Sequence, residues 1–218
     1  MKKVILAVPK CRILKELIPI LNKMNVKIED DFYNDDSRKL FFKTNEVNFE
    51  IIRVRSFDVA TFVAFGAAQI GVAGNDVLTE FEYDEIYSVL DLKIGKCRLS
   101  VAKKKNERHN RAEKSGHLLV ATKYKNTVTN FYAEKGIRAE CIKLNGAIEL
   151  APKLQMCSAI VDLVSSGKTL KENDLDEKEV LLNITSQLIV NKVAYKVMNP
   201  NISKWIKKFE KVVNEQNN

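Results

Sequence analysis

The sequence has few of the residues that build metal sites or disulfide frameworks. Its 218 residues include only four cysteines and two histidines. Cys11, Cys97, Cys141 and Cys157 are far apart, and none forms a C-x-x-C pair, so neither a zinc site nor a disulfide scaffold is expected. We therefore predict no metal ligands from the chain itself and a reducing compartment, the cytoplasm.

Long apolar runs are also missing. No window of about 18 residues is apolar enough to predict a membrane span. The apolar run 4–8 ends at Pro9 and Lys10, which is too early for the hydrophobic region of a signal peptide. We expect this run to be a buried first strand, and we expect no membrane partner.

Positive charge is abundant but concentrated. The net charge is +8, and residues 96–114 hold eight Lys or Arg against two Glu, a net charge of +6. The hydrophilic run 103–114 is most simply a solvated loop. A nucleic-acid surface would interleave aromatic residues, and this run has none. We expect no nucleic-acid partner; salt-dependent binding of DNA or RNA would support the opposite interpretation.

What the sequence does contain is an alternation of strand-length apolar runs with helical patterns. This alternation predicts an α/β fold with βαβ units and mainly parallel sheets. The predicted strands are 4–8, 49–54, 69–73, 86–90, 98–102, 117–122, 138–143 and 158–161, with a long β-rich run at 180–190. The predicted helices are 13–24, 59–65 with Asp58 as N-cap, a short one through Leu78 and Phe81, 128–135, 147–153, one from 169 and 202–213.

The length suits two small domains. We place a crossing near residues 95 and 96 and a return near 190. Domain I would be 1–95 plus 190–218, with the last helix packing back on it, and domain II would be 96–189. Ligands of open α/β sheets bind at the carboxyl ends of strands and in the cleft between domains, so candidate residues are sought there.

The most informative segment is 159–170, which predicts a strand, an acid, a small turn and a helix start. Backbone N–H groups at such a turn can hold an anion, and Gly167 lets the backbone approach a phosphate closely. Ser165, Ser166 and Thr169 can add hydroxyl donors. A capped surface helix with a glycine turn fits the same spacing.

Asp162 ends the predicted strand, where it could accept hydrogen bonds from sugar hydroxyls. The following Gly-Lys-Thr resembles a Walker A loop, but that motif requires glycine at position 162. A P-loop NTPase is therefore excluded.

Further charged residues follow other predicted strands or begin helices. Lys10 and Arg12 could form a polyanion site, and Arg38 and Arg55 could clamp a diphosphate through two hydrogen bonds each. Glu149 lies in a strand-to-helix turn, where it could bind ribose hydroxyls. Taken singly, each is more often a surface charge.

Neither histidine, His109 or His117, stands in a Ser-His-Asp or Cys-His pattern. The chain therefore offers many groups that bind anions and few that suit general base catalysis. This favours transfer chemistry that depends on positioning and charge stabilisation.

Taken in order, these segments resemble ATP phosphoribosyltransferase in its short form, the first enzyme of histidine biosynthesis. The resemblance covers nearly the whole chain. In the first half it rests on Pro9-Lys10-x-Arg12, Asp36-Ser37-Arg38-Lys39-Leu40, Val54-Arg55-x-x-Asp58-Val59, Gly66-Ala67-Ala68, Gly71-Val72-Ala73-Gly74-x-Asp76-Val77-Leu78 and Leu92-x-x-Gly95-Lys96-Cys97-Arg98-Leu99. In the second half it rests on Ala121-Thr122-Lys123-Tyr124, Phe131-Tyr132-Ala133-Glu134-Lys135-Gly136, Lys143-Leu144-Asn145-Gly146, Glu149-Leu150-Ala151-Pro152 and Asp162-x-Val164-Ser165-Ser166-Gly167-x-Thr169-Leu170.

The resemblance implies a two-domain fold like that of periplasmic binding proteins, with the active site in the cleft. It implies a glycosyltransferase in which N1 of the adenine of ATP attacks C1 of phosphoribosyl pyrophosphate and pyrophosphate leaves, with Mg²⁺ required. It also implies residue roles. Catalytic contacts to the phosphates of either substrate would come from Lys10, Arg12, Arg38 and Arg55. Asp76 would bind substrate near the nucleotide, and Glu149 and Asp162 would bind the ribose. The 5′-phosphate would be bound by Ser165, Ser166, Gly167, Lys168 and Thr169.

The chain departs from the family pattern at three places. Cys11 stands where glycine is usual, Lys168 replaces an arginine and so loses a bidentate fork, and the loop 103–114 is longer and more basic. The short form further implies a partner, a histidyl-tRNA-synthetase-like regulatory subunit, with the chain as a homodimer within a hetero-oligomer.

An alternative from another functional class is a non-catalytic intracellular small-anion-binding protein of the same fold. Such a binder has no need of a diphosphate site beside a ribose-phosphate site. The segment 162–169 together with Lys10 and Arg12 therefore favours the enzyme.

Overall fold

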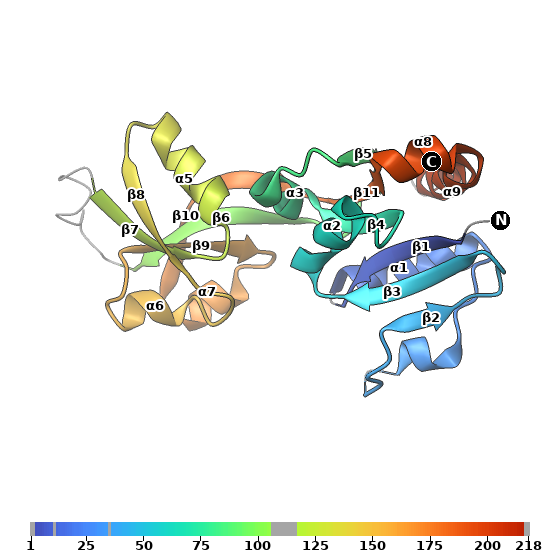
Figure 1. Cartoon of the computed structure of the whole chain (residues 1–218). Helices are drawn as coiled ribbons and strands as arrows, with labels where there is room; N and C mark the ends of the chain where they lie inside the picture. Colours follow the sequence, from blue (N-terminus) through green and yellow to red (C-terminus); the bar gives the residue numbers. More distant parts are fainter. Residues whose placement is uncertain (1–2, 11, 35, 106–116, 216–218) are drawn as a thin grey trace. The chain divides into compact units, whose positions relative to one another are not determined.

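The computed structural model describes residues 3–10, 12–34, 36–105 and 117–215 (Figure 1). The chain divides into two compact units, Met1–Gly95 with Thr185–Asn218, and Lys96–Ile184. The return to the first unit lies at Thr185, five residues before the return expected near 190. The reason is that the strand from Ser186 pairs with strands of the first unit, so residues 185–189 belong there.

The first unit is built on a six-stranded sheet in the order β2-β3-β1-β4-β11-β5. Its central strands pair in parallel, β1 with both β3 and β4, while the outer pairings are antiparallel. The strands are β1 (Val4–Pro9), β2 (Phe41–Lys43), β3 (Phe49–Val54), β4 (Ile70–Gly74), β5 (Ile86–Asp91) and β11 (Ser186–Asn191).

Helices join these strands and cover the sheet. They are α1 (Arg12–Lys23), the 3-10 turn η1 (Asp30–Tyr33), α2 (Ser56–Ala64), α3 (Asn75–Phe81), α8 (Lys192–Val197) and α9 (Asn199–Glu215). Asp58, expected to cap α2, instead lies in its first turn, because the helix begins two residues earlier, after Arg55. Gly66 ends this helix with φ +73°, as its position predicts.

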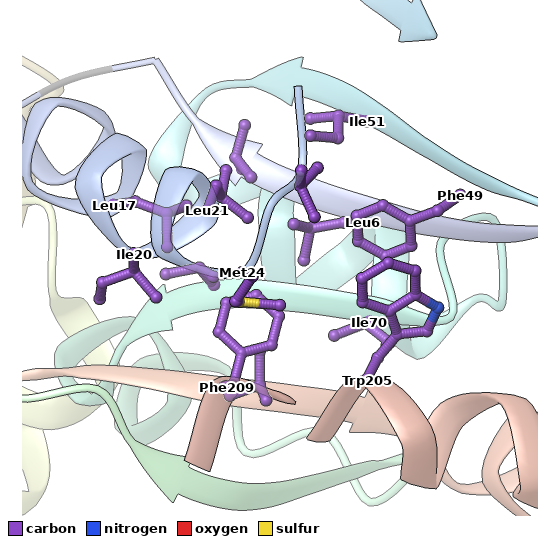
Figure 2. Packing of buried hydrophobic residues seen from close by; sticks show 14 of the residues in the cluster. Leu6, Leu17, Ile20, Leu21, Met24, Phe49, Ile51, Ile70, Trp205 and Phe209 are labelled. Atoms are coloured by element: carbon purple, nitrogen blue, oxygen red, sulfur yellow. The ribbon is translucent and has the colours of Figure 1, made fainter. Parts of the chain in front are cut away.

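The core of this unit joins the two ends of the chain. Figure 2 shows Trp205 and Phe209 of α9 among side chains of α1 and of the central strands. The Trp205 ring stacks on Phe49 with 3.7 Å between ring centroids. The apolar stripe of the last helix is thus core, and it fixes α9 against strands formed 150 or so residues earlier in the chain.

The second unit holds a five-stranded sheet in the order β10-β6-β9-β7-β8. Its strands are β6 (Cys97–Lys104), β7 (His117–Thr122), β8 (Arg138–Lys143), β9 (Ala159–Val164) and β10 (Leu175–Ile184). Strand β7 pairs in parallel with β8 and β9, whereas β6 pairs antiparallel with β9 and β10. One face carries α5 (Lys125–Glu134) and the other carries α6 (Leu150–Lys153) and α7 (Lys168–Glu172) (Figure 1).

Both sheets are therefore mixed rather than mainly parallel. The expected βαβ units form the centres, but antiparallel strands complete each sheet. The expected run 180–190 is in fact the end of β10 and the start of β11, which belong to different sheets. Among the described residues no helix is long and apolar enough to cross a bilayer.

Candidate functional site

A cavity in the second unit lies over the segment that the sequence singles out. Its volume is about 150 Å³, and it is lined by Glu149, Ile160, Asp162, Leu163, Val164, Ser165, Ser166, Gly167, Lys168, Thr169 and Leu170. The fold thus places Glu149, in the turn before α6, beside residues 162–169. This segment includes the last residues of β9 and the turn that follows them. The apolar floor of the cavity is part of the core under α6 and α7, which holds Ile160, Val164 and Leu170.

Gly167 shapes the turn between β9 and α7. Its φ is +75°, in the left-handed region, and it is the residue before the first turn of α7. An added Cβ would meet nothing closer than Val164 Cγ1 at 4.0 Å, so space does not require glycine here. The requirement comes from the backbone conformation, which lets the chain turn sharply back over the cavity.

The polar groups of the loop point to solvent and away from the core. Ser165, Ser166, Lys168 and Thr169 are all exposed. The Ser166 hydroxyl accepts a hydrogen bond from the Lys168 N–H at 3.4 Å, and the Lys168 ammonium lies 3.8 Å from Glu172. A cavity rimmed by hydroxyls, one lysine and a left-handed glycine suits an oxyanion such as a phosphate.

Asp162 lies inside β9 and not at its end, which corrects the expected position. It pairs with Ser100 across the sheet, and β9 continues to Val164. Its Oδ1 atom is 3.5 Å from Nζ of Lys123 and has no hydrogen-bond partner among the described residues. The strand therefore fixes the acid, Oδ1 is buried and faces a cation, and the side chain, 24% exposed, lines the cavity.

Lys123 was not among the expected site residues. It follows β7, and β7 and β9 are parallel neighbours, so the end of β7 lies beside Asp162. The sequence signals were its place directly after the predicted strand 117–122, which many surface lysines share, and its presence in the family-like segment Ala121-Thr122-Lys123-Tyr124.

Behind the loop, Arg98 binds the carbonyl of Ser165 and also Glu177 of β10. The hydrogen bond from Arg98 lowers the pKa of Glu177 below its ordinary value, partial burial opposes this, and a hydrogen bond from Ser100 adds to the lowering. The same hydrogen bond raises the pKa of Arg98.

In the first unit, expected cations gather at the carboxyl edge of β1 and β3. Pro9 and Val54 end these parallel strands as register partners, and the Lys10 N–H donates to the Val54 carbonyl at 2.7 Å. Exposed Lys10 and Arg55 therefore lie at one edge. Arg12 begins α1, with its Nε 3.5 Å from Glu16. Cys11, between them, lies outside the described residues.

Arg38 is brought to the same edge by a buried neighbour of Arg55. Arg53 is only 2% exposed, and its guanidinium donates to the carbonyls of Phe32 and Ser37 at 3.0 and 3.2 Å. It thereby fixes the segment before β2, where Arg38 is exposed. Arg53 and Arg55 thus have different roles, one structural and one available to a ligand.

Asp76 lies in the first turn of α3, two residues after β4, and is 5% exposed. It therefore differs from the open cations at the ends of β1 and β3. Within the described part of the chain, no group of three or more His, Cys, Asp or Glu side chains could hold a metal ion. Of the basic loop 103–114, residues from 106 on lie outside the described residues, as does His109.

Comparison with known proteins assigns the family. The family model described as HisG, ATP phosphoribosyltransferase, matches residues 55–211. The chain is 54% identical over 210 residues to an ATP phosphoribosyltransferase of Rhodospirillum rubrum, covering 95% of this chain and 92% of that one. It is 52% identical to one of Paramagnetospirillum magneticum, covering 96% of each.

Solved structures agree. The ATP phosphoribosyl transferase (HisG:HisZ) complex from Thermotoga maritima contains a chain with a TM-score of 0.82 and 28% identity, covering 97% of this chain and 99% of that one. A probable amino-acid ABC transporter extracellular-binding protein from Bacillus subtilis has a TM-score of 0.59 at 9% identity, covering 99% of this chain and 92% of that one, a likeness of fold alone. The binding-protein-like two-domain fold and the family resemblance are both confirmed: the chain belongs to the ATP phosphoribosyltransferase (HisG) family.

Proposed function

We propose that this chain transfers the phosphoribosyl group of phosphoribosyl pyrophosphate to N1 of the adenine of ATP, giving phosphoribosyl-ATP and pyrophosphate in the first step of histidine biosynthesis. Family membership and relatives of that name at 52–54% identity support the reaction. The observation that carries the site is the cavity over residues 162–169 with Glu149 on its rim.

In this proposal the loop binds the phosphoribosyl group. Ser165, Ser166, Lys168 and Thr169 donate to the 5′-phosphate, and Gly167 holds the turn open for it. Asp162 and Glu149, which both line the cavity, accept hydrogen bonds from the ribose hydroxyls. Fixing the ribose in this way orients C1 for attack.

The cations of the first unit bind phosphates in this proposal. Lys10, Arg12, Arg38 and Arg55 neutralise the departing diphosphate or the triphosphate of ATP, and Arg suits this because its planar fork matches two phosphate oxygens. Asp76 lies near the nucleotide in this proposal. Because its side chain is buried, it contributes to the shape of the site more than to the charge of the site.

The reaction needs little proton transfer. N1 of adenine has a free lone pair, a new N1–C1 bond forms, and the C1–O bond breaks with its electron pair leaving on pyrophosphate. Catalysis therefore consists of stabilising a ribosyl cation-like transition state and the leaving diphosphate. Asp162 and Glu149 supply negative charge near the developing cation.

Mg²⁺ enters this proposal as part of the substrate. In this proposal the diphosphate oxygens of phosphoribosyl pyrophosphate carry the ion, because Mg²⁺ in proteins is usually bound through substrate phosphates rather than by a cage of protein ligands. Bound there, it neutralises charge on the leaving group.

The partner is a regulatory subunit like that of the Thermotoga maritima complex, with this chain as a homodimer within a hetero-oligomer. The TM-score of 0.82 to the chain in the HisG:HisZ complex supports the partner, whereas the homodimer is part of the proposal alone. We propose the cytoplasm as the compartment, because the proposed reaction belongs to a biosynthetic pathway.

The test is release of pyrophosphate and formation of phosphoribosyl-ATP by the purified chain, with and without a HisZ-like subunit. Product should require Mg²⁺ and both substrates. GTP should not replace ATP, because N1 of guanine carries a hydrogen and lacks the free lone pair. If no combination gives product although the protein still binds phosphoribosyl pyrophosphate, the alternative interpretation, a non-catalytic small-anion-binding protein, would replace the enzyme.

A further inference from the structure

Arg98 stands at the centre of a polar network directly behind the loop 162–169. It is the second residue of β6, and its Nε and Nη2 donate to the two carboxylate oxygens of Glu177, each at 2.5 Å. This is the bidentate, charge-assisted geometry that gives ion pairs both strength and a fixed orientation. The two side chains are 33% and 25% exposed, so solvent screens the pair only partly.

The network ties three strands together. Glu177 comes from β10, and its Oε1 also accepts from the hydroxyl of Ser100 at 2.7 Å. Ser100 is 1% exposed and is the register partner of Asp162 on β9. The register between β6 and β10 shifts just after Glu177, between Glu177 and Glu179. The carboxylate thus sits where the backbone ladder is irregular and side chains must hold the strands in place.

The remaining donor of Arg98 reaches the loop itself. Nη1 donates to the carbonyl of Ser165 at 3.1 Å, and Ser165 is the first residue after β9. Arg98 also faces Val164 in the ladder. Nε, Nη1 and Nη2 are thus all engaged, and the guanidinium is joined to the loop through the carbonyl of Ser165.

We propose that Arg98 and Glu177 are a positioning pair that sets the phosphoribosyl-binding loop 162–169. The pair holds the first peptide of the turn, so the Ser165 and Ser166 hydroxyls and the left-handed Gly167 are presented to the 5′-phosphate without reordering. This inference rests on the proposed function, since it assigns the pair to the binding of that one substrate.

The physical reason is that loop sites gain affinity from rigidity. A loop that must order on binding loses part of the binding free energy, and small displacements of positioning groups reduce rate strongly. Lysine at position 98 keeps the charge but has one ammonium in place of the fork, so it cannot bind both Glu177 oxygens and the Ser165 carbonyl. Glutamine at position 177 turns one acceptor into a donor that faces Arg98.

The test compares Arg98→Lys and Glu177→Gln with wild type in steady-state kinetics. Each variant should raise KM for phosphoribosyl pyrophosphate about tenfold, as expected for loss of one charge-assisted hydrogen bond, while KM for ATP stays within about twofold. Because the two side chains act as a unit, the double variant should raise KM no further than the stronger single variant.

Lys135 and Glu179 offer a matched control. They form an ion pair that also uses β10, two residues beyond Glu177, and Glu179 does not line the loop cavity. Glu179→Gln should leave both KM values unchanged. If Arg98→Lys does not fold, Glu177→Gln alone carries the test.

Two results would overturn the pairing: unchanged KM for phosphoribosyl pyrophosphate in folded Glu177→Gln, or equal rises in KM for both substrates. Failure of the proposed function would be different, since wild type itself would then form no phosphoribosyl-ATP.

Discussion

At the scale of single residues, the site depends on one acid in an unusual position. Asp162 is inside β9, with a quarter of its side chain exposed and Lys123 at 3.5 Å. A strand residue has a less mobile backbone than a loop residue, so the carboxylate is held in place before the ligand arrives. Oδ1 is buried and faces Lys123, and the exposed part of the side chain lines the cavity, where it can accept from a sugar hydroxyl.

Replacing that charge should impair catalysis. We expect Asp162→Asn to lower kcat about 10²-fold, which is the usual cost of removing one electrostatic group at a transition state. The amide has nearly the same shape, so the fold should be unchanged by circular dichroism. Asp176→Asn, on β10 beside Lys178, is the control and should keep wild-type turnover. A wild-type kcat in Asp162→Asn would remove this acid from the chemistry.

Gly167 allows a prediction that separates backbone strain from ligand binding. Its φ of +75° makes alanine strained, although nothing crowds an added Cβ. We expect Gly167→Ala to cost about 1–2 kcal/mol of stability and to weaken binding of phosphoribosyl pyrophosphate. Thermal unfolding and calorimetry would measure the two effects.

Gly136 is the matched control for this substitution. It has φ +69° after α5, with nothing within 4 Å of an added Cβ. Gly136→Ala should cost similar stability and leave substrate affinity intact. Equal loss of affinity in both variants would show that the effect is general destabilisation.

At the scale of elements, the ion pair between β6 and β10 should make stability depend on pH. Arg98 lowers the pKa of Glu177 from 4.5 in the folded state, so folding is favoured when this acid is ionised. That stabilisation is present above pH 4.5 and is lost as pH falls through the lowered pKa. Wild type should therefore be more stable than Glu177→Gln near neutral pH, and the difference should shrink in acid.

The measurement is thermal unfolding of both proteins between about pH 7 and about pH 3. A difference in melting temperature that stays constant across this range would contradict the assignment, because the glutamine variant cannot titrate.

The last helix carries much of the core of the first unit. Phe209 is fully buried among residues of that core (Figure 2). Phe209→Ala should destabilise the protein by about 3–5 kcal/mol, from lost burial and the cavity it leaves. Phe65, 80% exposed, offers the same substitution at the surface and should cost under about 1 kcal/mol. Denaturant titration gives both values, and similar costs would contradict the packing.

The elements that the sequence predicted best have strong apolar patterns. Strand β3 and the helix α1 are close to their expected bounds, because β3 is a short run that is almost entirely buried and α1 has apolar residues at helical spacing. Strand β2 was not predicted: it is three residues long, with two of them exposed, so it leaves no periodic signal. Asp58 fitted a cap by residue type, but the helix begins at Ser56, and boundaries follow tertiary packing as much as capping preference.

The site shows the same limit. The hydroxyl- and glycine-rich loop was visible in the sequence because its residue types carry its chemistry. Lys123 and the pair of Arg98 and Glu177 were not, because their importance depends on which strands become neighbours. Arg53 and Arg55 likewise read alike in the sequence, yet one is buried under η1 and the other is exposed.

At the scale of the whole molecule, the chain crosses between its units twice, after Gly95 and after Ile184. The boundary between the units expected at residues 95 and 96 lies where the first run of predicted strands ends. The return was expected too late, because one apolar run conceals two strands that join different sheets. Hydrophobicity alone cannot show that break, since both halves are rich in apolar residues.

The central claim is that the loop 162–169 binds the phosphoribosyl group. The most direct measurement is a crystal structure of the protein with phosphoribosyl pyrophosphate and Mg²⁺. We predict the 5′-phosphate about 3 Å from the backbone and hydroxyl donors of Ser165–Thr169, with the ribose hydroxyls on Asp162 and Glu149. A 5′-phosphate bound elsewhere, with this loop empty, would contradict the account.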